Sequence, residues 1–367
     1  MAGLKLSSKS YSIEELQKKY YNFFAPAFKI TVDGKDLVKQ GMLITSVTVD
    51  TTYQSAADSF SIEIANAFDP AKRDFKWKDI VQLGAFVEVR LGYGDKLEPL
   101  FYGLITIVDY DYSSGDLPTM SVKGFDQSFI MMRGKKSKTW KQKRYCEVIR
   151  EIGAKYLPNL YVDDTAVIHE VVEQYEQSDF SFINSLALKC NYDFFVVGNS
   201  LYFKKALTEA EPVVALQWGK TLQSFSTQVN LSEQVNKVIL RGFNKTDYSK
   251  VIQGEAERVD KIGINTKTGR DVIRSLGEEL TTMHVYRNVD SKEDADNKAQ
   301  AILNKNSMSF VSGKGQCIGI PEIRAGEYIK IEGIGMKSGF IYYIKGATHK
   351  INSSGYTTAF DIGGNAI

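Results

Sequence analysis

Histidines, the residues best suited to acid–base or metal chemistry, have no obvious partners in this chain. There are three of them, His169, His284 and His349, and none has a Cys, Asp or Glu at the spacing of a metal-ligand motif. The pair His169–Glu170 lacks the second histidine of a zinc-hydrolase helix. His349 falls within a predicted strand of alternating residues, where a hydrogen-bonded structural histidine is the favoured interpretation.

Motifs for covalent or nucleotide chemistry are also missing. The sequence has no Gly-x-Ser-x-Gly turn and no Walker-type phosphate loop, and no predicted helix follows Gly333 and Gly335, which excludes a dinucleotide site. The three cysteines, Cys146, Cys190 and Cys317, lie far apart, so we expect buried free thiols rather than disulfides or a metal site. We therefore predict no catalytic residue, no cofactor and no metal, and we do not expect an enzyme.

One segment, residues 133–144, is strongly basic and contains a tryptophan. Its cationic and aromatic members are Arg133, Lys135, Lys136, Lys138, Trp140, Lys141, Lys143 and Arg144. Two interpretations stay open: a partner-docking loop anchored by Trp140, or a solvated connector between domains. Specific binding to nucleic acid is disfavoured, because 46 basic residues face 44 acidic ones and the remaining chain has no matching basic excess.

The composition is that of a globular chain with several domains. A length of 367 residues is sufficient for two to four domains, and 20 Tyr with 20 Phe are typical of a strand-rich chain. The net charge of +2 predicts no general attraction to nucleic acids or membranes. No secretory signal and no run of membrane-spanning length is visible, so we expect synthesis in the cytoplasm.

A duplicated pattern organises the chain. Residues 85–126 read as strand, turn, strand, Ser-Ser-Gly turn and strand, and residues 327–363 repeat this order. The glycine after the first strand and the glycine of the second turn are 23 residues apart in one copy and 22 in the other. We therefore predict two β-domains with a like fold, an architecture that favours a ring-forming structural protein over an enzyme.

Helical patterns lie at the N-terminus, in the middle and before the second copy. Ser12 and Glu15 predict a capping box, while Ser178 and Ser291 are good N-caps for two further helices. The predicted fold class is α+β, mostly β. Its parts are residues 1–127 (N-terminal helix and first β-domain), 128–210 (a small α+β insert) and 211–367 (second β-domain, with a polar extension at about 244–290).

Three segments resemble a known family. Residues 175–203 and 321–358, the latter including Tyr343 and His349, are similar to baseplate hub proteins of contractile phage tails. The alanine-rich helix at 291–304 matches the same family. The family includes the late-control protein D group and the N-terminal hub part of type VI secretion spike proteins. Asn191 stands where relatives often have a glycine, and asparagine tolerates the left-handed geometry.

The resemblance implies that both β-domains are tail-tube-like β-barrels. It implies a homotrimer, a pseudo-sixfold ring that joins a hexameric tail tube to a trimeric central spike. The expected location is the baseplate of a virion or phage-tail-like particle. Expected partners are the tail tube or a tube-initiator ring, the baseplate wedge proteins and the tape-measure protein. Because no needle follows the second β-domain, we expect the spike to be a separate polypeptide.

Two other functions remain open. A distal-tail or tube ring component would use the same fold, although a tube subunit needs only one barrel and the duplication argues against it. A β-rich protein that binds or cleaves cell-wall polysaccharide belongs to a different class, and no residue is nominated for that chemistry. Images of three-fold rings would favour the hub over both.

Overall fold

The protein is described from a computed structural model, which covers residues 4, 6, 9–53, 56–113, 117–206, 211–243, 250–262, 267–277, 280–286, 289–335 and 339–367. The helices are α1 (Ile13–Lys19), α2 (Ser128–Met131), α3 (Tyr145–Gly153), α4 (Asp179–Cys190), α5 (Gly269–Ser275) and α6 (Lys292–Ser307), with a 3-10 turn η1 (Tyr21–Phe23). Strands dominate the rest of the described chain, which confirms the predicted α+β, mostly β class.

The strands of the first half are β1 (Pro26–Val32), β2 (Lys35–Asp36), β3 (Ile44–Thr52), β4 (Ser59–Ile64), β5 (Phe68–Asp69), β6 (Asp74–Phe75), β7 (Phe86–Tyr93), β8 (Lys96–Asp111), β9 (Thr119–Asp126), β10 (Lys136–Lys143), β11 (Asn159–Val162) and β12 (His169–Gln177). Those of the second half are β13 (Tyr192–Val197), β14 (Ser200–Lys205), β15 (Pro212–Gln217), β16 (Leu222–Val229), β17 (Lys237–Phe243), β18 (Val251–Ala256), β19 (Thr281–Tyr286), β20 (Val311–Ile318), β21 (Tyr328–Glu332), β22 (Phe340–Asn352) and β23 (Gly355–Gly364).

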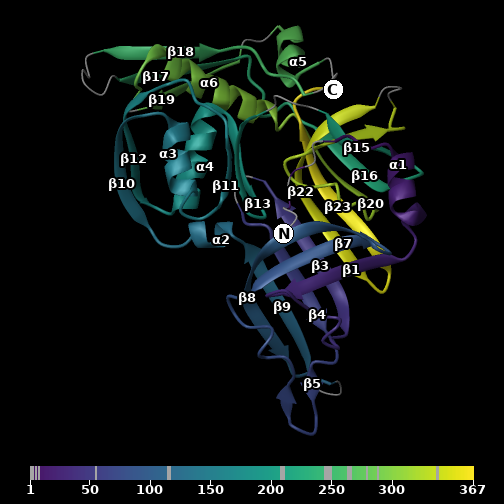
Figure 1. The fold of residues 1–367 in the computed structure, drawn as a ribbon. Coiled ribbons are helices and arrows are strands. Elements are labelled where there is room, and N and C mark those ends of the chain that lie inside the picture. Colours follow the sequence, from purple (N-terminus) through teal and green to yellow (C-terminus); the bar gives the residue numbers. More distant parts are fainter. Residues whose placement is uncertain are drawn as a thin grey trace.

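One sheet of 13 strands unites the two predicted β-domains. Its order is β16-β20-β23-β22-β3-β4-β9-β8-β7-β1-β2, and β21 lies beside β22 and pairs with β15. In Figure 1 the purple and blue strands of the first half run downward from the centre, and the yellow strands of the second half lie beside them. The predicted boundaries at 127 and 210 stay predictions, because both halves also contribute to one hydrophobic core.

Alternation of apolar and polar residues explains why these segments fold as strands. In β4 the side chains of Phe60, Ile62 and Ile64 are buried, and the residues between them point to the other face. A hairpin follows β1 at the Asp33–Gly34 turn, across which Thr31 pairs with Asp36. The period-2 pattern therefore places the core side of β4 correctly.

Local capping chemistry fixes the helices where the sequence predicts them. Ser12 and Glu15 form the capping box of α1, and the Ser178 hydroxyl accepts a hydrogen bond from the backbone N–H of Ser181 at the start of α4. Asn191 ends α4 in the left-handed conformation at φ 58° and ψ 48°. These helix ends and the predicted N-cap at Ser291 are confirmed.

Two inserted modules cover one end of the large sheet. The first module (residues 128–210) packs α3 and α4 against the strand pair β10–β12 and the sheet β11-β14-β13 around its own core. The second module (residues 230–310) packs α6 on β17 and β18, and its sequence range includes the predicted polar extension. Both modules lie at the top of Figure 1, where α4 and α6 are neighbours.

The transition from the second module to β20 differs from the prediction. A strand is expected from residue 307, but Ser307 is the last residue of α6 and β20 begins at Val311. The Ser307 hydroxyl donates to the backbone carbonyl of Asn304, within the last turn of α6. Among the described residues, no helix is both long and apolar enough to cross a membrane.

Candidate assembly interface

The duplicated pattern corresponds to two units with the same strand order. Unit 1 consists of β1, β3, β4, β7, β8 and β9, and unit 2 consists of β15, β16, β20, β21, β22 and β23. Within the sheet, unit 1 runs β3-β4-β9-β8-β7-β1 and unit 2 runs β16-β20-β23-β22-β21-β15. The strands therefore occupy equivalent places in both units. The repeat predicted from 85–126 and 327–363 forms only the last three strands of each.

The hydrogen-bonded register also repeats. β4 pairs with β9 over six residues from Ser59↔Phe125, and β20 pairs with β23 over the equivalent positions from Ser312↔Gly363. Bulges fall at the same places, near the start of β3 and β16 and in the middle of β8 and β22. One difference exists: β1 is antiparallel to β7, whereas β15 is parallel to β21.

The two units join through β3 of unit 1 and β22 of unit 2. Residues 47–52 pair antiparallel with residues 346–351. The Thr348 hydroxyl donates to the Asp50 carboxylate at 2.5 Å, and the Thr51 hydroxyl donates to the carbonyl of Ala347 at 3.3 Å. Side chains on the inner face of this contact are almost completely buried. We call this contact the internal joint.

A buried ion pair adds to the internal joint. Asp58 of the β3–β4 link binds the guanidinium of Arg324 from unit 2, and that guanidinium also donates to the carbonyl of Leu100 at 2.7 Å. Burial raises the pKa of Asp58, while the charge of Arg324 opposes the rise. Burial, and after it the charge of Asp58, raise the pKa of the neighbouring Asp126.

His349 belongs to the same contact and has a structural role. It pairs with Val49 in the internal joint, and its ring nitrogens bond the carbonyl of Ile323 at 2.8 Å and the hydroxyl of Tyr356 at 2.9 Å. Burial lowers the pKa of His349 to about 4, so the ring is neutral at pH 7. The prediction of a hydrogen-bonded structural histidine is confirmed.

Each unit leaves open the counterpart of the edge that the other unit uses in the internal joint. Within the described part of the chain, β16 pairs with β20 on one side, and its other side has no strand partner beyond the bridge at Leu222. The second half of β8 pairs with β9 on one side, and no described strand pairs with its other side. Large side chains on these edges are exposed: Val229 by 50%, Tyr110 by 41% and Tyr112 by 67%. Unpaired edges of this kind are templates for pairing with another chain.

The basic segment predicted as a docking loop forms a strand instead. Residues 136–143 are β10, which pairs antiparallel with β12. Trp140 is buried and stacks on Phe182 of α4, with ring centroids 5.6 Å apart, so it is not an exposed anchor. The expected loop is wrong because Trp140 supplies the apolar side of a strand that closes the core of the first module.

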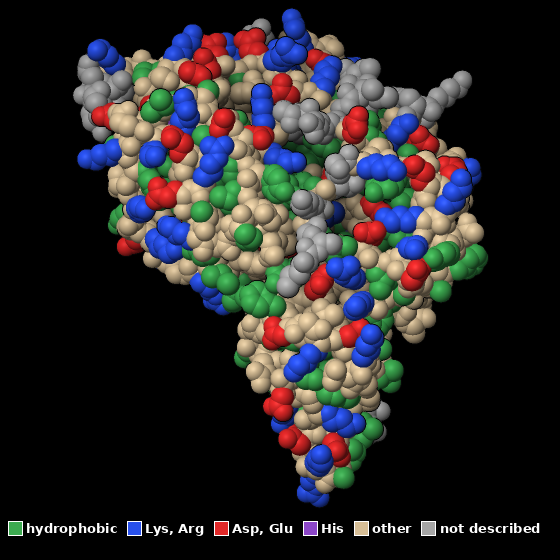
Figure 2. All heavy atoms as spheres, viewed as in Figure 1, with side chains coloured by type: hydrophobic (Ala, Val, Ile, Leu, Met, Phe, Trp, Pro, Cys, Tyr) green, Lys and Arg blue, Asp and Glu red, His purple; other side chains and the backbone are tan. Residues whose placement is uncertain are grey.

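Neighbouring carboxylates neutralise several cations of this segment. Lys136 binds Asp179 and Lys138 binds Glu151, both at 2.6 Å. The other predicted residues lie around this strand: Lys143 is 3.9 Å from Glu147, Arg133 lies over the ring of Phe129, and Lys135, Lys141 and Arg144 are exposed. In Figure 2 cationic and anionic side chains are interspersed over the visible face. Docking by the exposed cations stays a prediction.

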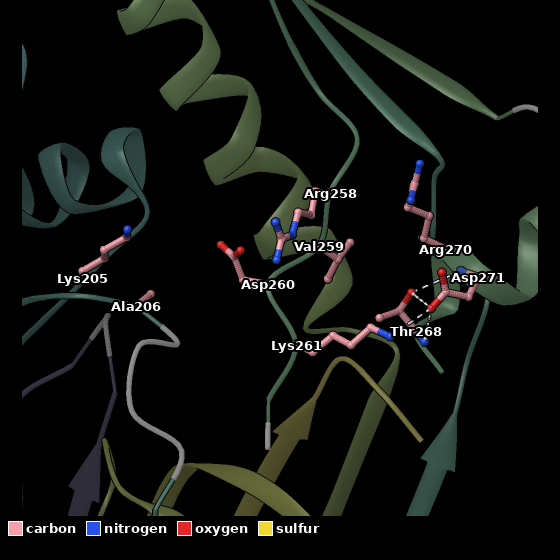
Figure 3. Close-up of a pocket in the computed structure, with 9 residues that line it drawn as sticks. All are labelled: Lys205, Ala206, Arg258, Val259, Asp260, Lys261, Thr268, Arg270 and Asp271. Carbon is pink, nitrogen blue, oxygen red and sulfur yellow. Dashed lines mark hydrogen bonds and ion pairs between the residues drawn. The ribbon is translucent and has the colours of Figure 1, made fainter. Parts of the chain in front are cut away.

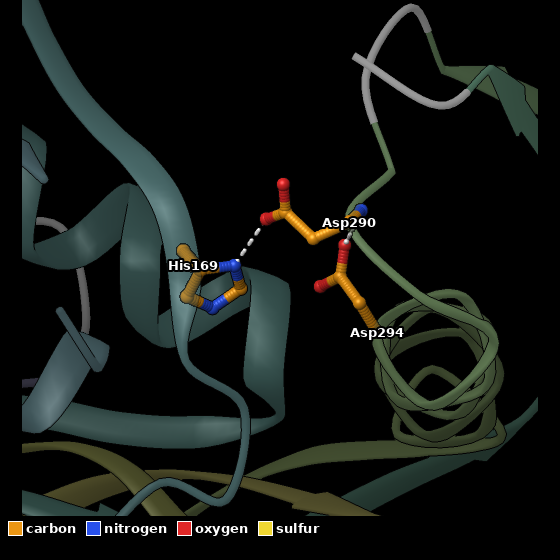
Figure 4. A group of neighbouring side chains, drawn as sticks. All are labelled: His169, Asp290 and Asp294. Atoms are coloured by element: carbon orange, nitrogen blue, oxygen red, sulfur yellow. Dashed lines mark hydrogen bonds and ion pairs between the residues drawn. The ribbon is translucent and has the colours of Figure 1, made fainter. Parts of the chain in front are cut away.

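One cluster was missed by the sequence because its members come from different modules. The Nδ1 atom of His169 lies 2.5 Å from Oδ2 of Asp290, and ligand atoms of His169, Asp290 and Asp294 lie within 4.8 Å of one another (Figure 4). This geometry resembles a metal site. However, Oδ2 of Asp294 already accepts from the ammonium of Lys298 at 2.6 Å and from the backbone N–H of Asp290. The cluster is therefore explained as a polar contact between modules.

A basic pocket lies between the modules and the C-terminal strands. Its volume is about 520 Å³, and the residues shown in Figure 3 line it: Lys205, Ala206, Arg258, Val259, Asp260, Lys261, Thr268, Arg270 and Asp271. The carboxylate of Asp271 is held by Thr268 and lies 3.6 Å from the ammonium of Lys261. These ion pairs and caps arrange no nucleophile beside a base.

A protein-family model matches this chain over most of its length. The model of the Alg8 N-terminal domain covers residues 25–353, which include every strand from β1 to β22. The chain belongs to the Alg8 N-terminal domain family. The name of the family states no reaction. No curated protein matches the chain.

Solved structures of phage tail proteins are similar to this Alg8 N-terminal domain. The 43 kDa tail protein of prophage MuSo2 from Shewanella oneidensis has a TM-score of 0.69 at 12% identity, over 92% of this chain and 98% of the other. A tail protein of Neisseria meningitidis MC58 also has a TM-score of 0.69, at 11% identity, over 93% and 97%.

A third similar structure comes from a secretion system. It is an Escherichia coli component of the type VI secretion system, described as structurally similar to the bacteriophage T4 tail proteins gp27 and gp5. Its TM-score is 0.55 at 13% identity, over 92% of this chain and 77% of the other. At such identities the similarity establishes the fold alone. This member of the Alg8 N-terminal domain family therefore has the fold of phage tail proteins.

Proposed function

We propose that this protein is the baseplate hub of a contractile phage tail or phage-tail-like injection particle. In this role it forms a trimeric ring with pseudo-sixfold symmetry, similar to the late-control protein D group. The observation that carries the proposal is the pair of like-ordered units joined through β3 and β22. The fold shared with phage tail proteins supports it.

The geometry of the internal joint suits a ring. β3 and β16 run in the same direction, because β3 is antiparallel to β22 and β22 is antiparallel to β16 through β23 and β20. The two units are therefore related by a rotation that keeps their direction, as neighbours in a ring are. A contact of this kind closes when repeated through a suitable rotation. Three chains with two units each give six like positions.

The two ends of the units fit partners of different symmetry. The first module follows β9 and the second module follows β16, and both strands end at the same end of the sheet, the upper end in Figure 1. Each chain has only one copy of each module, so a trimer has three copies of each at this end, which therefore has three-fold symmetry. At the other end the links carry no module: they are residues 65–85 in unit 1, with the short hairpin β5–β6, and residues 319–327 in unit 2. We assign the trimeric spike to the upper end and the hexameric tube to the lower one.

The proposed role is structural rather than enzymatic. Two buried titratable groups with shifted pKa values have structural partners: Asp58 binds Arg324 across the internal joint, and His349 bonds the carbonyl of Ile323. A tube subunit is the less favoured alternative, since it requires only one such unit. Wedge, tube-initiator and tape-measure proteins are the remaining proposed partners, and the baseplate is the proposed location.

Electron microscopy of the purified protein, alone and mixed with its candidate spike protein, tests this function. We expect rings with three-fold symmetry, six similar lobes and a central channel in at least the mixed sample. Compact single particles in both samples would contradict the hub. Rings built from single-unit lobes, without the pseudo-sixfold pattern, would also contradict it.

A further inference from the structure

We propose that β16 of one chain pairs with the second half of β8 in a second copy of the chain, in the register of the internal joint. This inference rests on the proposed ring and names the strands that close it. The partner is this same protein, because each chain carries both edges of an already formed contact in open form. We call the proposed contact the external joint.

Bulges align the two units residue by residue. After the bulges near the start of β3 and β16, regular pairing continues at Ser46 and Ser224. After the bulges in β8 and β22, it continues at Ile107 and Gly346. Counting onward from these four residues gives a counterpart for every residue of the internal joint.

On the inner side of the external joint, this alignment of the two units places apolar and aromatic residues opposite one another. The internal pairs Thr51↔Ala347, Val49↔His349 and Val47↔Ile351 become Val229↔Val108, Thr227↔Tyr110 and Phe225↔Tyr112. Pairs of aromatic and β-branched residues are among the favourable combinations across antiparallel strands. No charged residue falls on this inner side.

Exposure supports the assignment. The six residues on the inner side of the internal joint are exposed by 6% or less, whereas Val229, Tyr110 and Tyr112 are exposed by 41% to 67% in the isolated chain. Phe225 and Val108 are half-buried and already pack against the core. The external joint would complete the burial that the internal joint shows.

The outer side is also compatible with pairing. The hydrogen-bonded pair Asp50 and Thr348 of the internal joint becomes Gln228 and Asp109. An amide of Gln228 is a suitable donor to the Asp109 carboxylate. Neither position brings like charges together, which would oppose pairing.

The hairpin β5–β6 distinguishes the external joint from the internal one. Phe75 of this hairpin packs on Tyr110 and Tyr112, with ring centroids 4.6 and 5.5 Å apart, and Phe68 lies 6.2 Å from Tyr112. The corresponding link of unit 2, residues 319–327, has no such hairpin. The hairpin therefore holds the two exposed tyrosines in place beside the open edge, which lowers the ordering cost of binding.

Disulfide cross-linking tests the register. In the double variant Asp109→Cys/Gln228→Cys, oxidation should join neighbouring chains and give covalent dimers and trimers on a non-reducing gel. The Cα atoms of directly opposite residues lie within the range that a disulfide spans. The variant Asp109→Cys/Ser224→Cys shifts one partner by four residues, about 13 Å along the strand, and should give no such ladder.

An internal control accompanies this experiment. The variant Asp50→Cys/Thr348→Cys places cysteines at the equivalent positions of the internal joint and should form a disulfide within one chain. It verifies that the geometry and the oxidation conditions are adequate. The external joint would be contradicted if rings form and the internal control cross-links but the Asp109→Cys/Gln228→Cys variant does not. The proposed hub function would be unaffected by that result.

A charge substitution gives a second readout. Val229→Asp should abolish rings and leave monomers, because it buries a carboxylate on the inner side of the external joint. Val285→Asp, at a valine exposed by 69% on β19, is the matched control and should leave rings intact. Rings of Val229→Asp with unchanged abundance would contradict the pairing. Wild-type protein that never forms rings, with or without spike, would contradict the proposed function itself.

Discussion

The imidazole of His169 and the carboxylate of Asp290 join the two inserted modules, with Nδ1 2.5 Å from Oδ2. His169 is buried on β12 of the first module and stacks against Tyr145 of α3. Asp290 directly precedes the N-cap of α6 in the second module. Since 121 residues separate the two partners, this contact fixes the modules relative to each other rather than stabilising a local turn.

Substitution of His169 by alanine should loosen the contact between the modules. The hydrogen bond to a charged group and the stacking on Tyr145 are both lost, at a cost of about 2–3 kcal/mol. Amide hydrogen exchange in β12 and at the start of α6 should become faster. The exposed neighbour Glu170→Ala is the matched control and should leave exchange unchanged. Equal exchange rates in both variants would show that the contact carries no stability.

Substitution of Arg324 by methionine should destabilise the internal joint. It leaves the buried carboxylate of Asp58 without its counter-charge, which typically costs about 3–5 kcal/mol. Thermal unfolding should show a clearly lower Tm. Adding Asp58→Asn should recover part of the loss, because the buried charge is then gone. Lys330→Met, which breaks the more exposed pair with Glu332, is expected to cost less than about 1 kcal/mol.

Acid should weaken the internal joint through His349. Because burial lowers its folded pKa to about 4, below the ordinary value of 6.5, the unfolded chain binds a proton more readily than the folded one between these values. The free energy of unfolding contributed by His349 is therefore present above pH 6.5 and is lost as the pH falls towards 4. Denaturation of the wild type and of His349→Gln, measured from pH 4 to 7, isolates this contribution. A pH-independent difference between the two proteins would contradict it.

Local features of the fold were predictable, whereas long-range contacts were not. Capping at Ser12 and Ser178 depends on residues three positions away, and the burial of Phe60 and Ile62 depends on simple alternation. The internal joint depends on pairing across 298 residues, as between Asp50 and Thr348. Two separate β-domains were expected because nothing in a single strand specifies which distant edge it meets.

The candidate interface was predictable only in part. The repeat of 85–126 at 327–363 indicates a duplication, but the earlier strands β3 and β16 share no evident sequence pattern, so their equivalence follows only from the topology. Similarly, His169 has no nearby ligand in the sequence because its partner lies in the other module. Contacts between residues that are distant in the sequence, such as His169 and Asp290, depend on the topology of the fold and cannot be inferred from local sequence patterns.

The lysines around Trp140 favour a surface segment, either a docking loop anchored by Trp140 or a solvated connector. Lys141 and Lys143 alternate with Trp140 along β10, whereas Lys138 shares its face, lies over the indole ring at 5.0 Å and pairs with Glu151. The acidic residues Glu147 and Glu151 on the following helix were the available signal, since carboxylates at matching positions indicate ion pairs rather than a free basic loop.

Two substitutions in this segment separate stability from docking. Trp140→Ala should destabilise the first module by about 3–5 kcal/mol, because it removes a large buried ring that packs on Phe182. Near-ultraviolet circular dichroism and thermal unfolding would detect this loss. The double variant Lys135→Ala/Lys141→Ala changes only exposed cations and should leave Tm unchanged. Weaker binding of the candidate wedge or spike protein by this folded double variant would support docking by the basic face, and unchanged binding would exclude it.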